Sequence, residues 1–318
     1  MTTNRSAIIS KVYKVLKKHY KPVAPPADRT ALEHLLYGCL VENARFEAAD
    51  EAFARLKELF FDWNEIRVTT VTELAEGMAG VPDASAAAQR VKKSLQSIFE
   101  SNYSFDIETL KKQNLGKAEK DLEKVNGATP FVRAYVTQNA LGGHSIPVSR
   151  GALDALHAVG VISDVEADKG QVPGLERAIP KNKGVEFGSL LQQLGADLLA
   201  SPGSGKLKAV LSEIDPEFKD RLTTRQARLE AAAVAEAAAA RQARDKARAE
   251  MRAAAAAAEA KPSKSGKGSK HKDAAKSASA DGNKLKSKDK GFAKSQPTPP
   301  AKKDAPSAAT GLAKKKPR

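Results

Sequence analysis

The sequence predicts an all-α protein, and three observations lead to this fold class. Across residues 1–222, apolar side chains recur at spacings of three and four, which places them on one face of a helix. No segment shows the alternation of apolar and polar residues, rich in β-branched side chains, that is typical of a strand. From Thr223 to Ala260 the chain is mostly Ala, Arg and Glu, residues that favour the helix intrinsically.

The individual helices have recognisable beginnings and ends. Residues 8–20 form an amphipathic pattern with lysines opposite the apolar face, and a proline-rich stretch ends it. Asp28 or Thr30 can cap the helix that follows. Thr70 with Glu73 is a capping-box pattern that opens another helix. The same periodicity predicts helices over residues 8–20, 32–40, 48–59, 70–78 and 91–99, a short piece at 107–110, and helices centred on 135, 153–156 and 190–198.

Composition divides the chain into three regions. Residues 1–222 contain nearly all the aromatic side chains and form the predicted helical domain. We expect residues 223–260 to form a solvated helix, because their large apolar residues are too few for a packing stripe or a coiled coil. The large apolar residues of this segment are Leu229, Val234 and Met251. Residues 261–318 are rich in Lys, Ser, Gly, Pro and Ala, and with almost nothing to bury they are expected to form a disordered tail.

The positive charge is concentrated in this tail. The whole chain has a net charge of +15, and residues 261–318 contain 17 Lys and Arg against four Asp. The preceding 260 residues are therefore nearly neutral. A basic tail on a neutral domain predicts a polyanionic partner, either nucleic acid or an acidic membrane surface. The alternative is a tail that only keeps the protein in solution.

Several classes of protein are excluded by the sequence. Cys39 is the single cysteine, which rules out an intrachain disulfide framework and any site that needs several thiolates. The five histidines are scattered and none lies at metal-ligand spacing, so we expect no metal and no cofactor. Lysines interrupt the N-terminal segment, and no stretch approaches the roughly 20 consecutive apolar residues of a membrane span. We expect a cytoplasmic protein without membrane contact, associated with the nucleoid if the source is bacterial.

The most informative stretch is residues 122–136. A helix is predicted to end near Val125, Gly127 makes a sharp turn, and Pro130 suits the first position of a new helix. The free N–H groups at the start of that helix, with the helix dipole behind them, form a natural phosphate site. The same pattern also fits a plain helical hairpin.

The order of segments around this hairpin adds information. Upstream lies Leu-Tyr-Gly-Cys-Leu-Val-Glu-Asn-Ala-Arg at residues 36–45, and downstream lie Ile-Pro-Val-Ser-Arg at 146–150, Ile-Pro at 179–180 and a helix at 190–198. This arrangement resembles endonuclease III and the wider helix-hairpin-helix superfamily of base-excision DNA glycosylases. The resemblance covers about residues 28–202 and implies a two-lobed helical fold.

The resemblance also implies binding to double-stranded DNA through its backbone phosphates. In that family the hairpin reads approximately Leu-Pro-Gly-Val-Gly-x-Lys-Thr-Ala, and its backbone amides hold a phosphate. The matching residues here are Gly127, Ala128 and Thr129. Lys124 and Arg133 could add positive charge nearby. Thr129 stands where the family has its second glycine, and a Cβ in a tight turn could distort the phosphate site.

The family's chemical groups are replaced in this sequence. Phe131 occupies the position of the Schiff-base lysine, and Ser149 occupies the position of the aspartate in a Val-Asp-Thr-His-like segment. Cleavage of a glycosidic bond in this way requires a nucleophile and a charged carboxylate; Phe131 can supply neither, and Ser149 carries no charge. We expect Ser149 to cap the helix that starts at Arg150. The region that carries four iron–sulfur cysteines in many members is here residues 195–202, which contain none.

A further position concerns the segment that reaches into the DNA stack in this family. It aligns with Glu42 and Asn43. Asn43 could contact a base or a gap in the duplex, and the alternative is a polar helix terminus. The negative charge of Glu42 close to DNA counts against the first interpretation.

These observations lead to three hypotheses. The first is a degenerate member of the endonuclease III-like superfamily that binds DNA without glycosylase or lyase chemistry. The second is an active DNA glycosylase or abasic-site lyase in base-excision repair, with atypical catalytic residues. The third is a DNA-compacting protein that acts through a tail resembling those of linker histones. No feature of the sequence identifies a protein partner.

Overall fold

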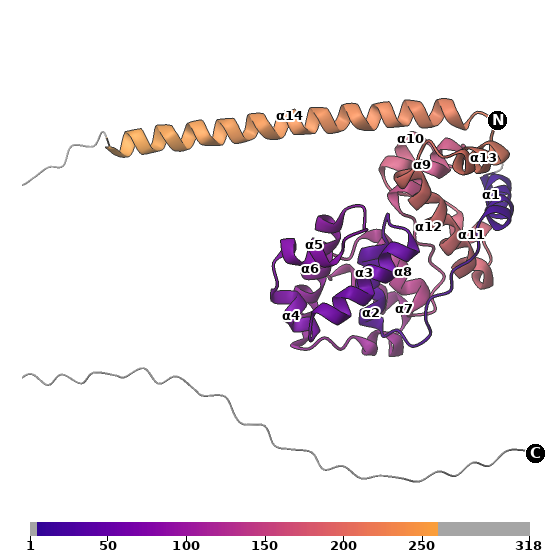
Figure 1. Ribbon diagram of the computed structural model, residues 1–318, viewed down its shortest axis with the longest axis horizontal. Helices are drawn as coiled ribbons and strands as arrows, with labels where there is room; N and C mark the ends of the chain where they lie inside the picture. The colour runs from indigo at the N-terminus through magenta and orange to yellow at the C-terminus, as the bar shows by residue number, and fades with distance from the viewer. Residues whose placement is uncertain (1–4, 260–318) are drawn as a thin grey trace, which may run out of the picture. The chain divides into compact units, whose positions relative to one another are not determined.

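The computed structural model describes the backbone of residues 5–259 and the side chains as far as Arg252. Every regular element in this part of the chain is a helix, which confirms the all-α prediction (Figure 1). The longer elements are α1 (Arg5–His19), α2 (Ala31–Val41), α3 (Phe46–Leu59), α6 (Ala84–Asn102), α7 (Leu115–Glu123), α8 (Pro130–Asn139), α9 (Arg150–Ala158), α12 (Gly184–Ala200), α13 (Gly205–Ile214) and α14 (Phe218–Glu259). The short ones are α4 (Trp63–Val68), α5 (Val71–Gly77), η1 (Glu108–Lys112), α10 (Asp164–Asp168), α11 (Leu175–Ala178) and η2 (Lys181–Lys183).

The first lobe is built around α2. This helix is apolar on all sides, and every residue in it except Glu33 is buried. It contacts α3, α6, α8 and η1, and the apolar faces of these elements form one hydrophobic core with α4, α5 and α7. A helix without a polar face is stable only when neighbours enclose it, so α2 becomes the axis of the lobe.

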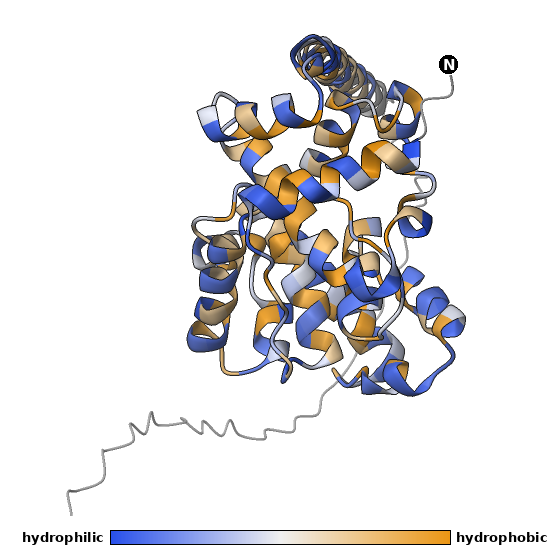
Figure 2. Ribbon diagram, turned by 90° about the vertical axis from the view of Figure 1, so that its right-hand side faces the viewer, coloured by the Kyte–Doolittle hydropathy of each residue, from blue (hydrophilic) through white to orange (hydrophobic). Residues whose placement is uncertain are grey.

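The second lobe combines both ends of the folded region. α1 packs against α11, α12 and α13, and its buried residues Ile9, Val12 and Leu16 join a core made mainly by α9–α13. The predicted two-lobed organisation is thus confirmed, with one hydrophobic core in each lobe. Figure 2 shows the apolar faces of the helices turned inward and polar residues outside.

Polar caps fix the helix boundaries that the sequence predicts. Thr30, rather than Asp28, caps α2, accepting the backbone N–H of Glu33 at 3.1 Å. Thr70 and Glu73 form the predicted capping box at α5. The helices α4, α10, α11 and α13 lie in segments where no helix was predicted.

The long helix α14 begins inside the second lobe. Phe218, Leu222 and Arg225 are buried there, so α14 starts before the predicted domain boundary at residue 222. Val234 and Met251, farther along, are mostly exposed. None of the helices in the described residues is long and apolar enough to cross a membrane. The predicted disordered tail at 261–318 lies outside the described residues.

The close crossing of α9 and α12 offers a test of the fold. A Cβ on Gly151 would overlap the carbonyl oxygen of Gly195, and a Cβ on Gly195 would lie 2.5 Å from the amide nitrogen of Ala152. We expect Gly151→Ala to lower the free energy of unfolding by about 1–3 kcal/mol through overpacking. Gly203→Ala is the matched control, since nothing lies within 4 Å of its Cβ position. Equal urea midpoints for the two variants would contradict the close crossing.

His34 makes stability depend on pH. Its side chain is buried and its Nδ1 atom has no hydrogen-bond partner among the described residues. Burial, assisted by the nearby Arg29 charge, lowers its pKa to about 4. Between about pH 6.5 and about pH 4 the unfolded chain therefore binds a proton that the folded chain does not.

Stability should consequently fall as the pH is lowered through this window. One such proton contributes at most about 1.4 kcal/mol per pH unit. We expect His34→Gln to show a shallower decline than the wild type when unfolding is measured in urea across the window. Parallel declines would show that His34 is not the group responsible.

Candidate nucleic-acid interface

The hairpin between α7 and α8 adopts the conformation that its glycine predicts. Gly127 has φ +99°, in the left-handed region that favours glycine. A Cβ at this position would lie 2.6 Å from the carbonyl oxygen of Arg90 and 2.8 Å from the hydroxyl of Ser94, both on α6. Glycine is therefore required both by the backbone conformation and by the lack of space. The turn itself is half-exposed.

The start of α8 follows two residues later. Thr129 is the N-cap and accepts the backbone N–H of Val132 at 3.2 Å, and Pro130 is the first helical residue, as predicted. Thr129 has φ −63°, so its Cβ causes no strain where the family has a second glycine. The turn tolerates this departure because only Gly127 needs the left-handed conformation.

The amides of this turn differ in their hydrogen bonding. The N–H of Asn126 donates to the Ser97 hydroxyl at 3.1 Å, and that of Ala128 donates to the Val125 carbonyl at 3.1 Å. Within the described part of the chain, no hydrogen bond is donated by the N–H groups of Gly127 and Thr129. Two backbone donors are thus left at a half-exposed helix N-terminus.

The charged side chains around the hairpin differ in whether they form ion pairs. Lys124 is 76% exposed and pairs with Asp121 at 2.7 Å, while Arg133 is half-buried and forms no ion pair with another described residue. Glu42 lies behind the turn, where it accepts the Thr129 hydroxyl at 3.0 Å and lies 3.3 Å from Nε of Arg90. Burial raises the pKa of the Glu42 carboxyl against the opposing effect of Arg90. Its charge is therefore directed into the protein.

Asn43 connects the two lobes. It has φ +77°, and its Oδ1 accepts the backbone N–H of Arg150 at 3.1 Å, at the first residue of α9. Together with Glu42, Arg90 and Arg150 it lines an open groove between the lobes, which we call the interlobe groove. Asn43 therefore lies in an open groove, but its side-chain oxygen Oδ1 already accepts a hydrogen bond from within the protein.

The two positions of the family's chemical groups are closed by packing. Phe131 is 3% exposed and stacks on Tyr135 with ring centroids 6.2 Å apart. Ser149 is 1% exposed and caps α9, accepting the N–H of Ala152 at 3.4 Å, as predicted. Neither side chain is ionisable in a useful range, and neither is presented to solvent.

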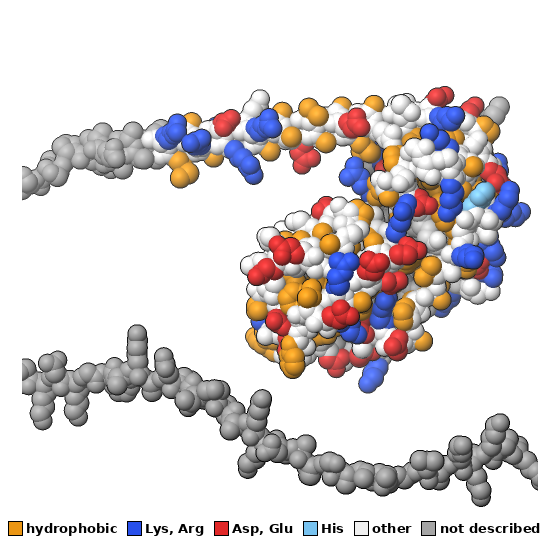
Figure 3. Space-filling model, viewed as in Figure 1, with side chains coloured by type: hydrophobic (Ala, Val, Ile, Leu, Met, Phe, Trp, Pro, Cys, Tyr) orange, Lys and Arg blue, Asp and Glu red, His pale blue; other side chains and the backbone are white. Residues whose placement is uncertain are grey.

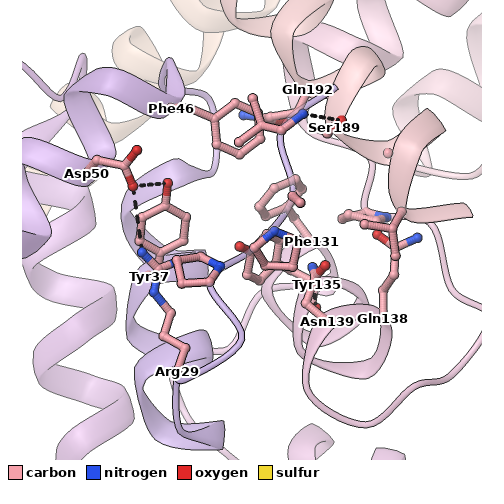
Figure 4. A pocket seen from close by; sticks show the side chains of 17 residues that line it. Arg29, Tyr37, Phe46, Asp50, Phe131, Tyr135, Gln138, Asn139, Ser189 and Gln192 are labelled. Carbon is pink, nitrogen blue, oxygen red and sulfur yellow. Dashed lines mark hydrogen bonds and ion pairs between the residues drawn. The ribbon is translucent and has the colours of Figure 1, made fainter. Parts of the chain in front are cut away.

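An aromatic cavity of about 100 Å³ lies beside Phe131 (Figure 4). It is bordered by aromatic rings of α2, α3 and α8 and by polar groups of α3, α8 and α12. The aromatic residues are Tyr37, Phe46, Phe131 and Tyr135; the polar side chains are Arg29, Asp50, Gln138, Asn139, Ser189 and Gln192. Two polar atoms, Nε2 of Gln138 and Oε1 of Gln192, are buried without a partner among the described residues.

Asp50 is the only carboxylate among the residues that line this cavity, and no lysine is among them. The Tyr37 hydroxyl donates to Asp50 at 2.7 Å, and the Arg29 guanidinium lies 3.6 Å from the same oxygen and 3.7 Å from the centroid of the Tyr37 ring. The residues that line the cavity therefore include one acid, which is paired with Arg29 and Tyr37, and no lysine amine that could form a Schiff base.

The sequence prediction did not include this cavity. The sequence contains a weak indication of the cavity, because Gln138 and Gln192 are polar residues on otherwise apolar, buried helix faces. The amide of Gln192 donates to the Val41 carbonyl at 2.5 Å and to that of Ala44 at 3.1 Å, which ties α12 to the first lobe. Asp50 had no such signal, since it is exposed, as an acidic residue on an amphipathic helix ordinarily is.

The residues present do not fit an iron–sulfur cluster. Four thiolates are needed, and the single cysteine, Cys39, is buried on α2 beside Ser94. Burial raises the pKa of its thiol to about 12. Gly195, at the start of the matching segment, belongs to the crossing with α9. No group of His, Cys, Asp and Glu among the described residues could hold a metal ion.

Comparisons with known proteins bear on the fold. No family model matches the chain, and no curated protein matches its sequence. Among solved structures, a non-covalent endonuclease III–DNA complex is similar, with 15% identity and a TM-score of 0.50 over 70% of this chain and 100% of that chain. A trapped covalent endonuclease III–DNA intermediate (16% identity, TM-score 0.47, 69% of this chain and 100% of that one) is also similar. A thermostable thymine-DNA glycosylase is similar as well, with 14% identity and a TM-score of 0.44 over 67% of this chain and 97% of that one. The first of these shows that the chain has the fold of endonuclease III, the helical fold expected from the hairpin and its surroundings.

Proposed function

We propose that the protein binds duplex DNA by gripping a backbone phosphate at the turn of the hairpin. The observation that carries this proposal is the pair of unbonded amides at Gly127 and Thr129, half-exposed at the N-terminus of α8. Such amides, reinforced by the helix dipole, bind phosphate oxygens well. Lys124 and Arg133 supply positive charge on either side. The similar endonuclease III structure is a complex with DNA, which supports the choice of nucleic acid.

We also propose that the protein lacks glycosylase and lyase chemistry. Phe131 and Ser149 are buried and uncharged, the Ser149 hydroxyl is used as the cap of α9, and no lysine lines the adjoining aromatic cavity. Binding and chemistry depend on different groups, so one can persist without the other. The backbone holds the phosphate, whereas bond cleavage needs particular side chains.

The basic segment at 261–318 adds a second, sequence-independent contribution in this proposal. Its charge attracts the phosphate backbone and displaces counterions, which makes binding strongly dependent on salt. In the alternative with a DNA-compacting function, this segment would account for all of the affinity. The free amides at Gly127 favour a contribution from the folded region.

One observation favours a second candidate function. Asp50 lines the aromatic cavity beside Phe131, where a carboxylate could stabilise a cationic sugar. An active glycosylase would then use Asp50 in place of the family's aspartate. Its contacts with Tyr37 and Arg29 oppose that role, because they neutralise the carboxylate before any substrate arrives.

Binding is tested with the full chain and a fluorescent duplex. We expect Lys124→Gln with Arg133→Gln to weaken binding and to reduce the slope of log K against log salt by about 1.8, or about 0.9 for each lost phosphate contact. Lys14→Gln with Arg177→Gln is the control, since both side chains are exposed on α1 and α11 and the change of charge is identical. An equal loss in both double variants would show that only net charge matters, and the hairpin would have no special role.

Chemistry is tested by incubating the wild-type protein with duplexes that contain abasic sites or oxidised and alkylated bases. We expect neither base release nor strand cleavage above a protein-free background. Product that disappears in Asp50→Asn, with DNA affinity unchanged, would establish the second candidate function in place of the first.

A further inference from the structure

The long helix α14 is held at its root by ion pairs that fix its rotation. Arg225 is buried and its Nε lies 2.5 Å from Asp154 of α9, and its Nη1 lies 3.1 Å from Asp168 of α10. Arg228 pairs with Asp168 at 2.7 Å and with Asp164 at 3.2 Å. A helix held on two successive turns presents a defined face in each direction along its length.

One of these faces borders the interlobe groove. Gln226, Leu229 and Glu230 line the groove together with Asn43 and Arg150. The face of α14 on which Glu230 lies is thus turned toward the interlobe groove. The rest of that face can be followed along the helix by counting residues, because α14 is unbroken to Glu259.

Four arginines continue this face. They lie 11, 14, 18 and 22 residues after Glu230, and at about 100° per residue each points within about 40° of the direction of Glu230. They are Arg241, Arg244, Arg248 and Arg252, and we call them the arginine face. With a rise of about 1.5 Å per residue they extend from about 16 Å to about 33 Å beyond Glu230.

The acidic residues between 230 and 252 lie on several sides of the helix. Glu250 is nearly opposite to Glu230 and Glu236 lies about 120° from it, whereas Asp245, at about 60°, borders the arginine face and Glu230 lies at its start. Figure 3 shows Lys and Arg side chains along the half of α14 farthest from its buried root.

The arginine face has no structural task in the described part of the chain. All four side chains are exposed, and none forms an ion pair with another described residue. The residues between them include three alanines and are exposed as well. The guanidinium groups are therefore free to bind an anionic partner, and arginine binds phosphate oxygens in a bidentate manner.

We propose that the arginine face contacts the phosphates of a duplex that extends out of the interlobe groove. This inference rests on the proposed DNA binding and adds a second contact to that of the hairpin. It identifies α14 as a binding element that lengthens the DNA footprint by several base pairs. The partner is duplex DNA because the inference extends the duplex binding proposed for the hairpin, and backbone phosphates are the anions that arginine binds.

The test measures affinity as a function of salt with the full chain and a duplex of about 20 base pairs, long enough to reach past Arg252 at about 3.4 Å per base pair. We expect replacement of all four arginines by glutamine to reduce the salt slope by about 3.6, since each lost contact removes about 0.9. Circular dichroism checks that the helix is retained, which is expected because glutamine is a good helix former.

A charge-matched variant separates position from net charge. Ala239→Arg with Arg241→Ala, and Gln242→Arg with Arg244→Gln, move two arginines off the arginine face, to about 180° and about 120° from Glu230, without changing composition. We expect this variant to lose about 1.8 of the slope. Two outcomes would overturn the inference and leave the proposed function intact. One is that the charge-matched variant binds DNA as the wild type does. The other is that the quadruple variant keeps the wild-type salt slope while the hairpin variant binds more weakly. Absence of any duplex binding by the wild type would overturn both.

Discussion

The turn at Gly127 lies directly on the backbone of α6, and the placement of the hairpin depends on this contact. There is no room for a Cβ between the turn and the Arg90 carbonyl, so only glycine allows α7 and α8 to approach α6 so closely. Arg90 in turn donates to the Cys39 carbonyl at 2.9 Å and pairs with Glu42, which accepts the Thr129 hydroxyl. The cap of α8 is thereby linked to α2 and α6. One close backbone contact thus fixes where the free amides of the turn are presented.

Much of the fold could be predicted from the sequence, because local rules and global packing agree there. The capping residues Thr30, Thr70 and Ser149 begin helices where the pattern places them. Pro130 and Gly127 defined the hairpin for reasons of backbone geometry alone. Each of these signals acts within a few residues and needs no knowledge of the tertiary structure.

The parts that escaped prediction are those decided by distant contacts. α13 buries Leu207, Val210 and Leu211 against α1, which is nearly 200 residues away along the chain. Its amphipathic pattern is too short to predict a helix without knowledge of this contact. Asn43 illustrates the same limit at the site. From the sequence it is a polar residue after a helix, yet its side chain satisfies the first amide of α9 in the other lobe. Periodicity cannot reveal such a partner.

The aromatic cavity escaped for a related reason. Its walls come from segments before α2 and from α2, α3, α8 and α12, and no local motif links Arg29 with Asp50 or Gln138 with Gln192. The resemblance pointed to Phe131 and Ser149, two side chains that lack the amine and the carboxylate of the family's chemistry. The neighbouring carboxylate became visible only when the helices were assembled.

The departures from the family pattern fall on the groups that do chemistry and spare those that shape the backbone. Gly127 is kept where φ is positive, whereas Thr129 replaces glycine where φ is negative and any residue is tolerated. A phosphate held by main-chain amides requires only the path of the chain. A Schiff base requires an amine, and stabilisation of an oxocarbenium ion requires a carboxylate, and neither Phe131 nor Ser149 supplies such a group. In the proposed function DNA binding without glycosylase chemistry is possible, because the two depend on different atoms of the protein.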